Sequence, residues 1–152
     1  MSVFFNHLHS YNRYLVLLAL VFVLFRAFSG WLGRKPYEKA DNIGAAALLG
    51  LTHLQVLIGL IQYFAFSAYT TTPGLSMKDP WVRYFKAEHI AAMLIAAALI
   101  QIGRIVSKKA AADVDKHRKM ATYTAIAALL IIGTLAMKGL LFGSLAAVTS
   151  GQ

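Results

Sequence analysis

Residues 14–32 read YLVLLALVFVLFRAFSGWL, an apolar run whose one charged side chain is Arg26. A helix that crosses the hydrocarbon core of a bilayer needs about 20 mostly apolar residues, and this run has that length. The sequence Gly-Arg-Lys-Pro follows at 33–36 and predicts the end of the helix. The run therefore predicts a membrane-spanning helix.

Three further apolar runs, at residues 43–66, 85–106 and 123–141, are also long enough to span a bilayer. The connections between neighbouring runs are short, except for residues 67–84, where Pro and Gly indicate turns. Four antiparallel helices with such connections form a bundle. We therefore expect an all-α integral membrane four-helix bundle, with residues 1–152 as one membrane domain.

The composition supports this class. Of the 152 residues, 59% are hydrophobic and 14% are charged, whereas soluble domains carry about a quarter charged residues. The net charge of +9 would suggest nucleic acid as a partner of a soluble protein. Here the basic residues lie between apolar runs, so we expect no nucleic acid and instead a lipid bilayer as the surroundings. The chain has no cysteine, which excludes disulfides and thiolate metal sites.

Basic residues are unequally divided between the two sides of the predicted bundle. One side carries nine of them: Arg34, Lys35, Lys39, Arg104, Lys108, Lys109, Lys116, Arg118 and Lys119. The other side carries four: Arg13, Lys78, Arg83 and Lys86. Lys and Arg concentrate in cytoplasmic loops. We therefore expect a multi-pass protein of a bacterial inner (cytoplasmic) membrane with both termini outside the cytoplasm, and we expect Arg26 to snorkel to the surface.

The five histidines are the chief candidates for function: His7, His9, His53, His89 and His117. An ionisable group inside a membrane span is costly and is a functional hypothesis by default. His53 lies near the middle of the second predicted span, His89 in the non-cytoplasmic half of the third, and His9 just before the first. We expect His7 to lie in a solvated tail and His117 to belong to an interfacial basic cluster.

Two histidines on different helices that face the bundle interior have the arrangement required for axial ligation of a haem iron. The ligand pair is open among His9, His53 and His89. His53 lies about 12 Å deeper than His89 at 1.5 Å per residue. His9 matches the depth of His89 better but lies at the membrane interface.

Charged residues near the non-cytoplasmic surface complete the predicted haem site. Arg13, Arg83 or Lys86 is expected to meet the haem propionates, and Glu88 is the candidate for taking up or releasing a proton. Two histidine ligands leave no open iron position, which favours electron transfer over oxygen chemistry. Whether the protein is an enzyme remains open at this point.

Other interpretations of the same residues are also open. His9, His89 and Glu88 are the one set suited to a metal ion other than haem iron, since imidazole binds zinc, copper and iron alike. His53 at mid-span is the candidate for an ion site in a small transporter-like bundle. In a cofactor-free structural or assembly subunit, the histidines would hydrogen-bond between helices.

Short sequence elements spread over nearly the whole chain resemble a known family. They are His9-Ser10, Arg13-Tyr14, His53-Leu54-Gln55, Gly59-Leu60, Tyr63-Phe64, Met77-Lys78-Asp79-Pro80, Arg83, Phe85, Glu88-His89 and Lys116-His117-Arg118. These residues resemble the short bacterial membrane proteins labelled cytochrome B-like. The resemblance implies haem b and electron transfer between a quinone and a membrane redox partner, with His9, His53, His89 and His117 as the family positions.

The number of histidines per span limits the number of haems. Every predicted span has at most one histidine, so one haem is expected. This arrangement is similar in architecture to the haem-bearing membrane anchor of succinate dehydrogenases, in which two helices each supply one ligand. A lone four-helix bundle has little interior for a cofactor, and a homodimer is therefore a further expectation.

Overall fold

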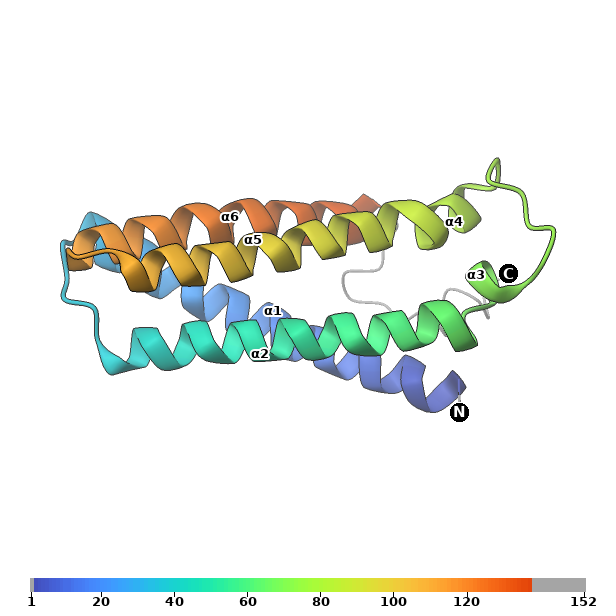
Figure 1. Cartoon of the computed structure of the whole chain (residues 1–152), viewed down its shortest axis with the longest axis horizontal. Helices are drawn as coiled ribbons and strands as arrows, with labels where there is room; N and C mark the ends of the chain where they lie inside the picture. The colour runs from blue at the N-terminus through green and yellow to red at the C-terminus, as the bar shows by residue number, and fades with distance from the viewer. Residues whose placement is uncertain (1, 138–152) are drawn as a thin grey trace.

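Four long helices lie side by side in the computed structural model, which describes residues 2–137 (Figure 1). They are α1 (Ser2–Leu32), α2 (Lys39–Ile61), α5 (His89–Lys109) and α6 (Asp113–Met137). All four are long and apolar enough to cross a membrane. The predicted all-α four-helix membrane bundle is confirmed; residues 138–141 of its last span lie outside the described residues.

The helices form a four-membered ring in cross-section. α1 packs against α2 and α6, and α5 packs against α6 and α2, so that α1 and α5 lie diagonally opposite. Four short elements lie at the end where α2 leads into α5. They are η1 (Gln62–Phe66), α3 (Ala68–Thr71), α4 (Pro80–Arg83) and η2 (Tyr84–Glu88), of which η1 and η2 are π-helical turns. We call this the loop end.

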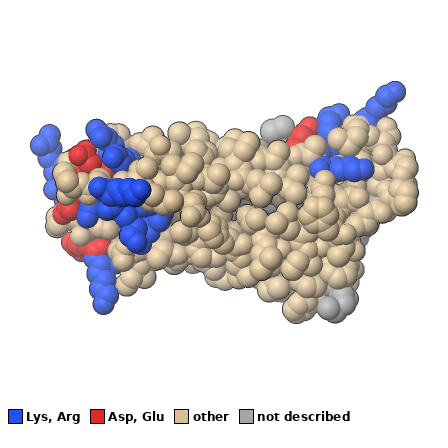
Figure 2. All heavy atoms as spheres, viewed as in Figure 1, with Lys and Arg blue, Asp and Glu red and all other residues tan. Residues whose placement is uncertain are grey.

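The opposite end, where α1 connects to α2 and α5 to α6, is the basic end (Figure 1). Charged side chains gather at the two ends, and the broad middle of the face shown carries none (Figure 2). Large apolar side chains such as Leu18, Phe25 and Leu129 are about 70% exposed on the outer helix faces, at 67%, 70% and 75%. Such a belt suits contact with lipid tails, and the structure fits a multi-pass membrane protein.

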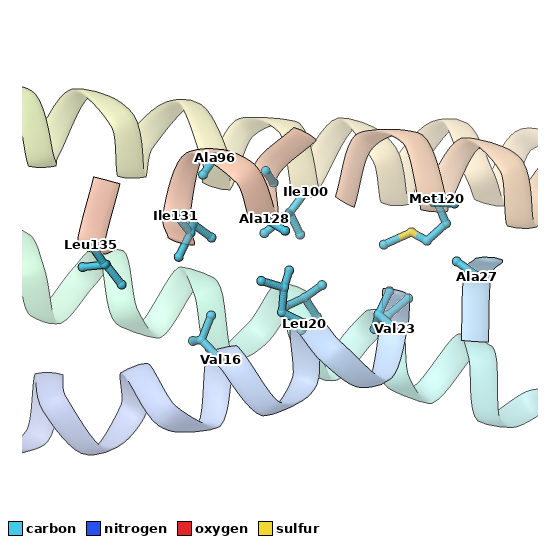
Figure 3. Close-up of a cluster of buried hydrophobic side chains, with 14 of the residues drawn as sticks. Val16, Leu20, Val23, Ala27, Ala96, Ile100, Met120, Ala128, Ile131 and Leu135 are labelled. Atoms are coloured by element: carbon cyan, nitrogen blue, oxygen red, sulfur yellow. The ribbon is translucent and has the colours of Figure 1, made fainter. Parts of the chain in front are cut away.

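The apolar core lies mainly between α1, α5 and α6 (Figure 3). Leu20 from α1 and Ile100 from α5 are almost wholly buried, at 1% and 0% exposure, and Met120 and Ile131 from α6 pack beside them. Alanines at 96, 127 and 128 let these helices approach closely. The core extends from the basic end to Tyr84 and Leu135 near the loop end, beside the cavity described below.

Two helices begin more than two turns earlier than the apolar runs predicted. α1 starts at Ser2, about three turns before residue 14, and α6 starts at Asp113 rather than at 123. The expectation that His7 and His9 precede the first helix is therefore wrong. Polar side chains interrupt the apolar run before residue 14, but Ser10 and Asn12 are buried in the bundle and let the helix continue.

His117 lies inside α6 and is not part of an exposed basic cluster, contrary to expectation. Its side chain is 2% exposed. The ring covers Gly30 so closely that a Cβ at position 30 would lie 2.4 Å from His117 Cε1. The Nε2 atom lies 3.4 Å from the carbonyl oxygen of Pro36, and the Tyr37 ring packs at 5.2 Å. His117 thus joins the α1–α2 connection to α6.

Arg26 extends to acidic side chains at the basic end, as a side chain that snorkels toward that surface would. Its Nε donates to Asp41 Oδ1 at 2.8 Å and one terminal nitrogen donates to Oδ2 at 3.1 Å. Glu38 lies 3.6 Å from the same guanidinium. The pair therefore ties α1 to the start of α2.

Gly103 sets the spacing between α5 and α6, and this leads to a prediction. A Cβ at position 103 would lie 2.6 Å from Tyr123 Cβ, an atom that moves only with its backbone. Gly103→Ala is expected to lower the free energy of unfolding by about 1–3 kcal/mol because the two helices must separate. The measurement is unfolding in mixed micelles. Gly133→Ala is the matched control, since nothing lies within 4 Å of its added Cβ; equal destabilisation by both would contradict this account.

Candidate functional site

A cavity of about 140 Å³ lies inside the bundle near the loop end. Side chains from α1, α2, η1, α5, α6 and the start of the 67–79 connection line it. Apolar residues such as Val16, Leu60, Met93 and Ile131 form much of its wall. Polar residues lie at the loop end, where Asn6, Gln62, Ser67 and Thr70 line it, and also farther in, where Ser10, Arg13 and Thr52 line it. The cavity is therefore largely apolar, with polar side chains at several depths.

His9 and His89 face each other across this cavity from the two diagonal helices. Both side chains line the cavity and are half-buried. Their ring centroids are 6.4 Å apart with an interplanar angle of 55°. Two imidazoles that bind one metal ion from opposite sides each approach it to about 2 Å, which places their centroids about 6 Å apart. The separation thus admits one metal ion between the rings.

Tyr84 orients His89 through a π-helical turn. In η2 the His89 amide donates to the Tyr84 carbonyl oxygen, five residues back, and this wider turn brings the two side chains together. The Tyr84 hydroxyl donates to the Thr134 carbonyl oxygen at 3.1 Å and lies 3.3 Å from His89 Nδ1. Because the Tyr84 hydroxyl donates its proton to the Thr134 carbonyl oxygen, it can only accept a hydrogen bond from His89 Nδ1–H. The proton of the neutral His89 ring is then on Nδ1, and Nε2 keeps its lone pair.

The neighbouring helix α2 positions His9. Gln55 Nε2 donates to the His9 carbonyl oxygen at 2.9 Å and lies 3.2 and 3.3 Å from the two ring nitrogens. Because Gln55 Nε2 is almost equally far from the two ring nitrogens, the amide lies against the face of the His9 ring. It is therefore not in line with the lone pair of either nitrogen. Asn12 holds Gln55 Oε1 at 2.8 Å and also donates to the Leu51 carbonyl oxygen. A Cβ at Gly59 would lie 3.4 Å from His9 Nε2, so glycine leaves room beside that nitrogen.

A buried hydroxyl on the cavity wall lacks a partner. Thr52 is 5% exposed, and its Oγ1 makes no hydrogen bond to any residue in the described part of the chain. Hydroxyls buried in a low-dielectric interior are normally satisfied. Arg13 also lines the cavity and is 8% exposed, so a cationic side chain lies about one turn deeper than His9. Both features are suited to an occupant with polar groups.

Tyr84→Phe tests the orienting role of the hydroxyl. The phenyl ring keeps the volume of a side chain that is 1% exposed, but it removes the acceptor for His89 Nδ1–H. Partners of this kind typically change affinity for a metal group by about 10–100-fold. We therefore expect Tyr84→Phe to lower the affinity of the His9–His89 pair for a metal group by at least about tenfold, measured with haem as the probe by its transfer to apomyoglobin. Tyr63→Phe, which removes a hydroxyl that bonds only the Lys86 carbonyl oxygen among the described residues, is the control and is expected to retain haem.

Several predicted site residues lie away from the cavity. His53 is exposed on the outer surface of α2, so of the three possible pairs only His9 and His89 are brought together. Glu88 pairs with Arg83 at 2.9 Å, and both side chains are more than 40% exposed, at 41% and 47%. Lys86 does not line the cavity either. Of the three candidate propionate partners, Arg13 alone lines it.

His7 is also outside the cavity: its side chain is exposed and stacks on Tyr11 at 6.1 Å between ring centroids. His117 lies at the basic end, far along α6 from the cavity. Within residues 2–137, no group of three His, Asp or Glu side chains converges in a way that could hold a metal ion. The expected alternative set of His9, His89 and Glu88 is therefore not assembled.

Two residues of the site, Tyr84 and Asn12, were missed from the sequence. Tyr84 stands among aromatic residues typical of a membrane interface, and no sequence signal announces the π-helical turn that directs it to His89. Gln55 and Asn12 carry a weak signal, since polar side chains in apolar helices usually face other helices.

No family model, curated protein or solved structure matches this chain. The function is therefore argued from the geometry of the cavity.

Proposed function

We propose that the protein is a small membrane b-type cytochrome that binds one haem through His9 and His89. The observation that carries this proposal is the pair of imidazoles facing each other across an interior cavity at 6.4 Å. With no third His, Asp or Glu converging on them among the described residues, a bound metal ion needs further ligands. A porphyrin supplies four nitrogens, and two imidazoles complete six-coordination.

The lining of the cavity suits an amphipathic macrocycle. The largely apolar walls match a porphyrin, and Arg13 on the cavity wall matches its carboxylates. The enclosed volume of about 140 Å³ is smaller than the roughly 300 Å³ or more of typical cofactor pockets. Haem binding therefore requires the walls to separate, which is easiest between α2 and α5 because they pack least closely among the four neighbouring pairs of long helices.

The residues of the chain have defined tasks in this proposal. Bound haem would carry one electron at a time between a quinone and a membrane redox partner. Tyr84 keeps the proton of His89 on Nδ1, so that Nε2 keeps a lone pair with which to bind a metal ion. Gln55 fixes the position of His9, and Arg13 balances negative charge.

The distribution of charge supports a location and an orientation. Nine Lys and Arg side chains belong to the basic end, at the ends of all four long helices. By the positive-inside rule this end faces the cytoplasm of a bacterium, and the cavity lies toward the opposite surface of the inner membrane. Both termini are then outside the cytoplasm.

Haem content tests the proposed function. The protein is purified from haem-replete cells in detergent, and the ratio of haem to protein is measured as the pyridine haemochrome. We expect one haem per chain, and in a homodimer two per dimer. Protein that contains neither haem nor metal by elemental analysis would refute the proposal and favour a cofactor-free subunit of a larger membrane complex.

A further inference from the structure

Two polar side chains lie inside the cavity at a greater depth than the histidines. Thr52 of α2 and Arg13 of α1 both line the cavity, and they are 5% and 8% exposed. The Asn12 amide donates to the Leu51 carbonyl oxygen at 3.0 Å. Arg13 and Thr52 are the next residues on these two helices, so they lie at a similar level of the bundle. Because Arg13 follows His9 by four residues, the pair lies about one helical turn deeper than that imidazole.

The protein itself does not use the hydroxyl of Thr52. A threonine in a helix commonly donates to the carbonyl oxygen four residues back, as Thr122 does to Arg118 at 2.9 Å. Thr52 Oγ1 makes no such bond to Leu48, nor to any other residue among those described. A buried hydroxyl costs free energy when it stays unsatisfied. It is therefore suited to an occupant of the cavity that carries an acceptor atom.

The polar groups at the loop end of the cavity are largely satisfied by the protein. The Gln62 amide donates to Asn6 Oδ1, and the Thr70 hydroxyl donates to backbone carbonyl oxygens. None of these groups is a cation, and Arg13 is the only Lys or Arg within residues 2–137 that lines the cavity. An anionic group of an occupant is therefore better placed at Arg13 and Thr52 than at the loop end.

We infer that Arg13 and Thr52 form a carboxylate subsite, which directs the propionates of a porphyrin into the bundle and away from the aqueous surface. This inference rests on the proposed function. A guanidinium pairs with a carboxylate, and a hydroxyl can donate a hydrogen bond to it. No Asp or Glu among the described residues lines the cavity, so no like charge opposes a carboxylate there. The subsite therefore selects a macrocycle with carboxylates over one that carries alkyl groups alone.

Two iron porphyrins separate this subsite from ligation by the histidines. Haem carries two propionates, whereas iron etioporphyrin carries alkyl groups alone, and both offer the same iron to His9 and His89. Their dissociation constants for the full chain, purified without haem in detergent micelles, are measured by titration of the Soret band. We expect Thr52→Val to weaken haem binding by at least about tenfold, as for a hydrogen bond to a charged group, and to leave etioporphyrin binding unchanged. Valine keeps the shape of the side chain and removes no hydrogen bond made by the described residues, so the fold should be kept.

Two further variants complete the design. Thr124→Val removes another buried hydroxyl that has no hydrogen-bond partner among the described residues, but this one does not line the cavity. Ser67→Ala removes a hydroxyl at the loop end of the cavity. Both are expected to leave the two dissociation constants unchanged.

The outcomes distinguish this inference from the proposed function. If Thr52→Val binds haem as tightly as the native chain, the inference is wrong and the proposed function stands. Weaker haem binding in Ser67→Ala alone would also overturn the inference and would direct the carboxylates to the loop end. If the native chain binds neither porphyrin, the proposed function fails and the inference fails with it.

Discussion

Replacing His89 by alanine is expected to abolish haem retention while the four helices stay folded in the membrane. In the proposed site this imidazole would be one of the two histidine ligands of the iron, and besides His9 the cavity offers no His, Asp or Glu side chain among the described residues to replace it. The measurement is Soret absorbance per mole of purified protein, with helix content followed by circular dichroism. His9→Ala is expected to give the same result for the same reason.

The remaining histidines provide the controls for this experiment. His7→Ala and His53→Ala are expected to retain haem at wild-type levels, since both side chains are exposed and neither lines the cavity. If the His9 and His89 variants both keep wild-type haem content, ligation by this pair is contradicted. If replacing His53 removes the haem and replacing His9 does not, the ligand lies on the outer face of α2. That result would also contradict ligation by His9 and His89.

Removing the cation of the Arg26–Asp41 pair is expected to destabilise the bundle strongly. The Asp41 side chain is 5% exposed and accepts two hydrogen bonds from the guanidinium. In Arg26→Leu a buried carboxylate remains without its partner, at a cost of about 3 kcal/mol. The measurement is the free energy of unfolding in mixed micelles of a neutral detergent and an anionic one.

A double variant separates the loss of the pair from the loss of packing. Arg26→Leu/Asp41→Asn removes the unpaired charge as well, and it is expected to recover more than half of the lost stability. The Asn side chain still accepts from the Glu38 amide, a bond of 2.8 Å in the native chain. If the double variant is as unstable as Arg26→Leu, the loss in free energy of unfolding comes from the lost packing of the aliphatic part of the Arg26 side chain. The ion pair then contributes little to stability.

The four spans were predictable because length and apolarity alone decide which segments cross a bilayer. Their ends were harder to predict. Polar residues at 6–13 end the apolar run but not the helix, since several of them face the cavity and one another. Likewise Arg26 has a buried acidic partner on α2, and a sequence pattern does not show which helix will present that partner.

The candidate site was partly predictable. Depth along the helices already favoured His9 with His89, but it did not exclude His53. What excludes His53 is the rotation of α2, which turns it to the outer surface and Gln55 to the interior. Rotation depends on packing with α1, including the contacts of Asn12, and the π-helical turn that brings Tyr84 to His89 has no sequence signature.

The most direct test of the central claim is an absorption spectrum of the purified protein, first oxidised in air and then reduced with dithionite. Six-coordinate haem with two histidine ligands predicts a Soret band that shifts on reduction, with sharp α and β bands appearing. Added carbon monoxide should leave the reduced spectrum unchanged because no iron position is open. A colourless sample from haem-replete cells would contradict the account.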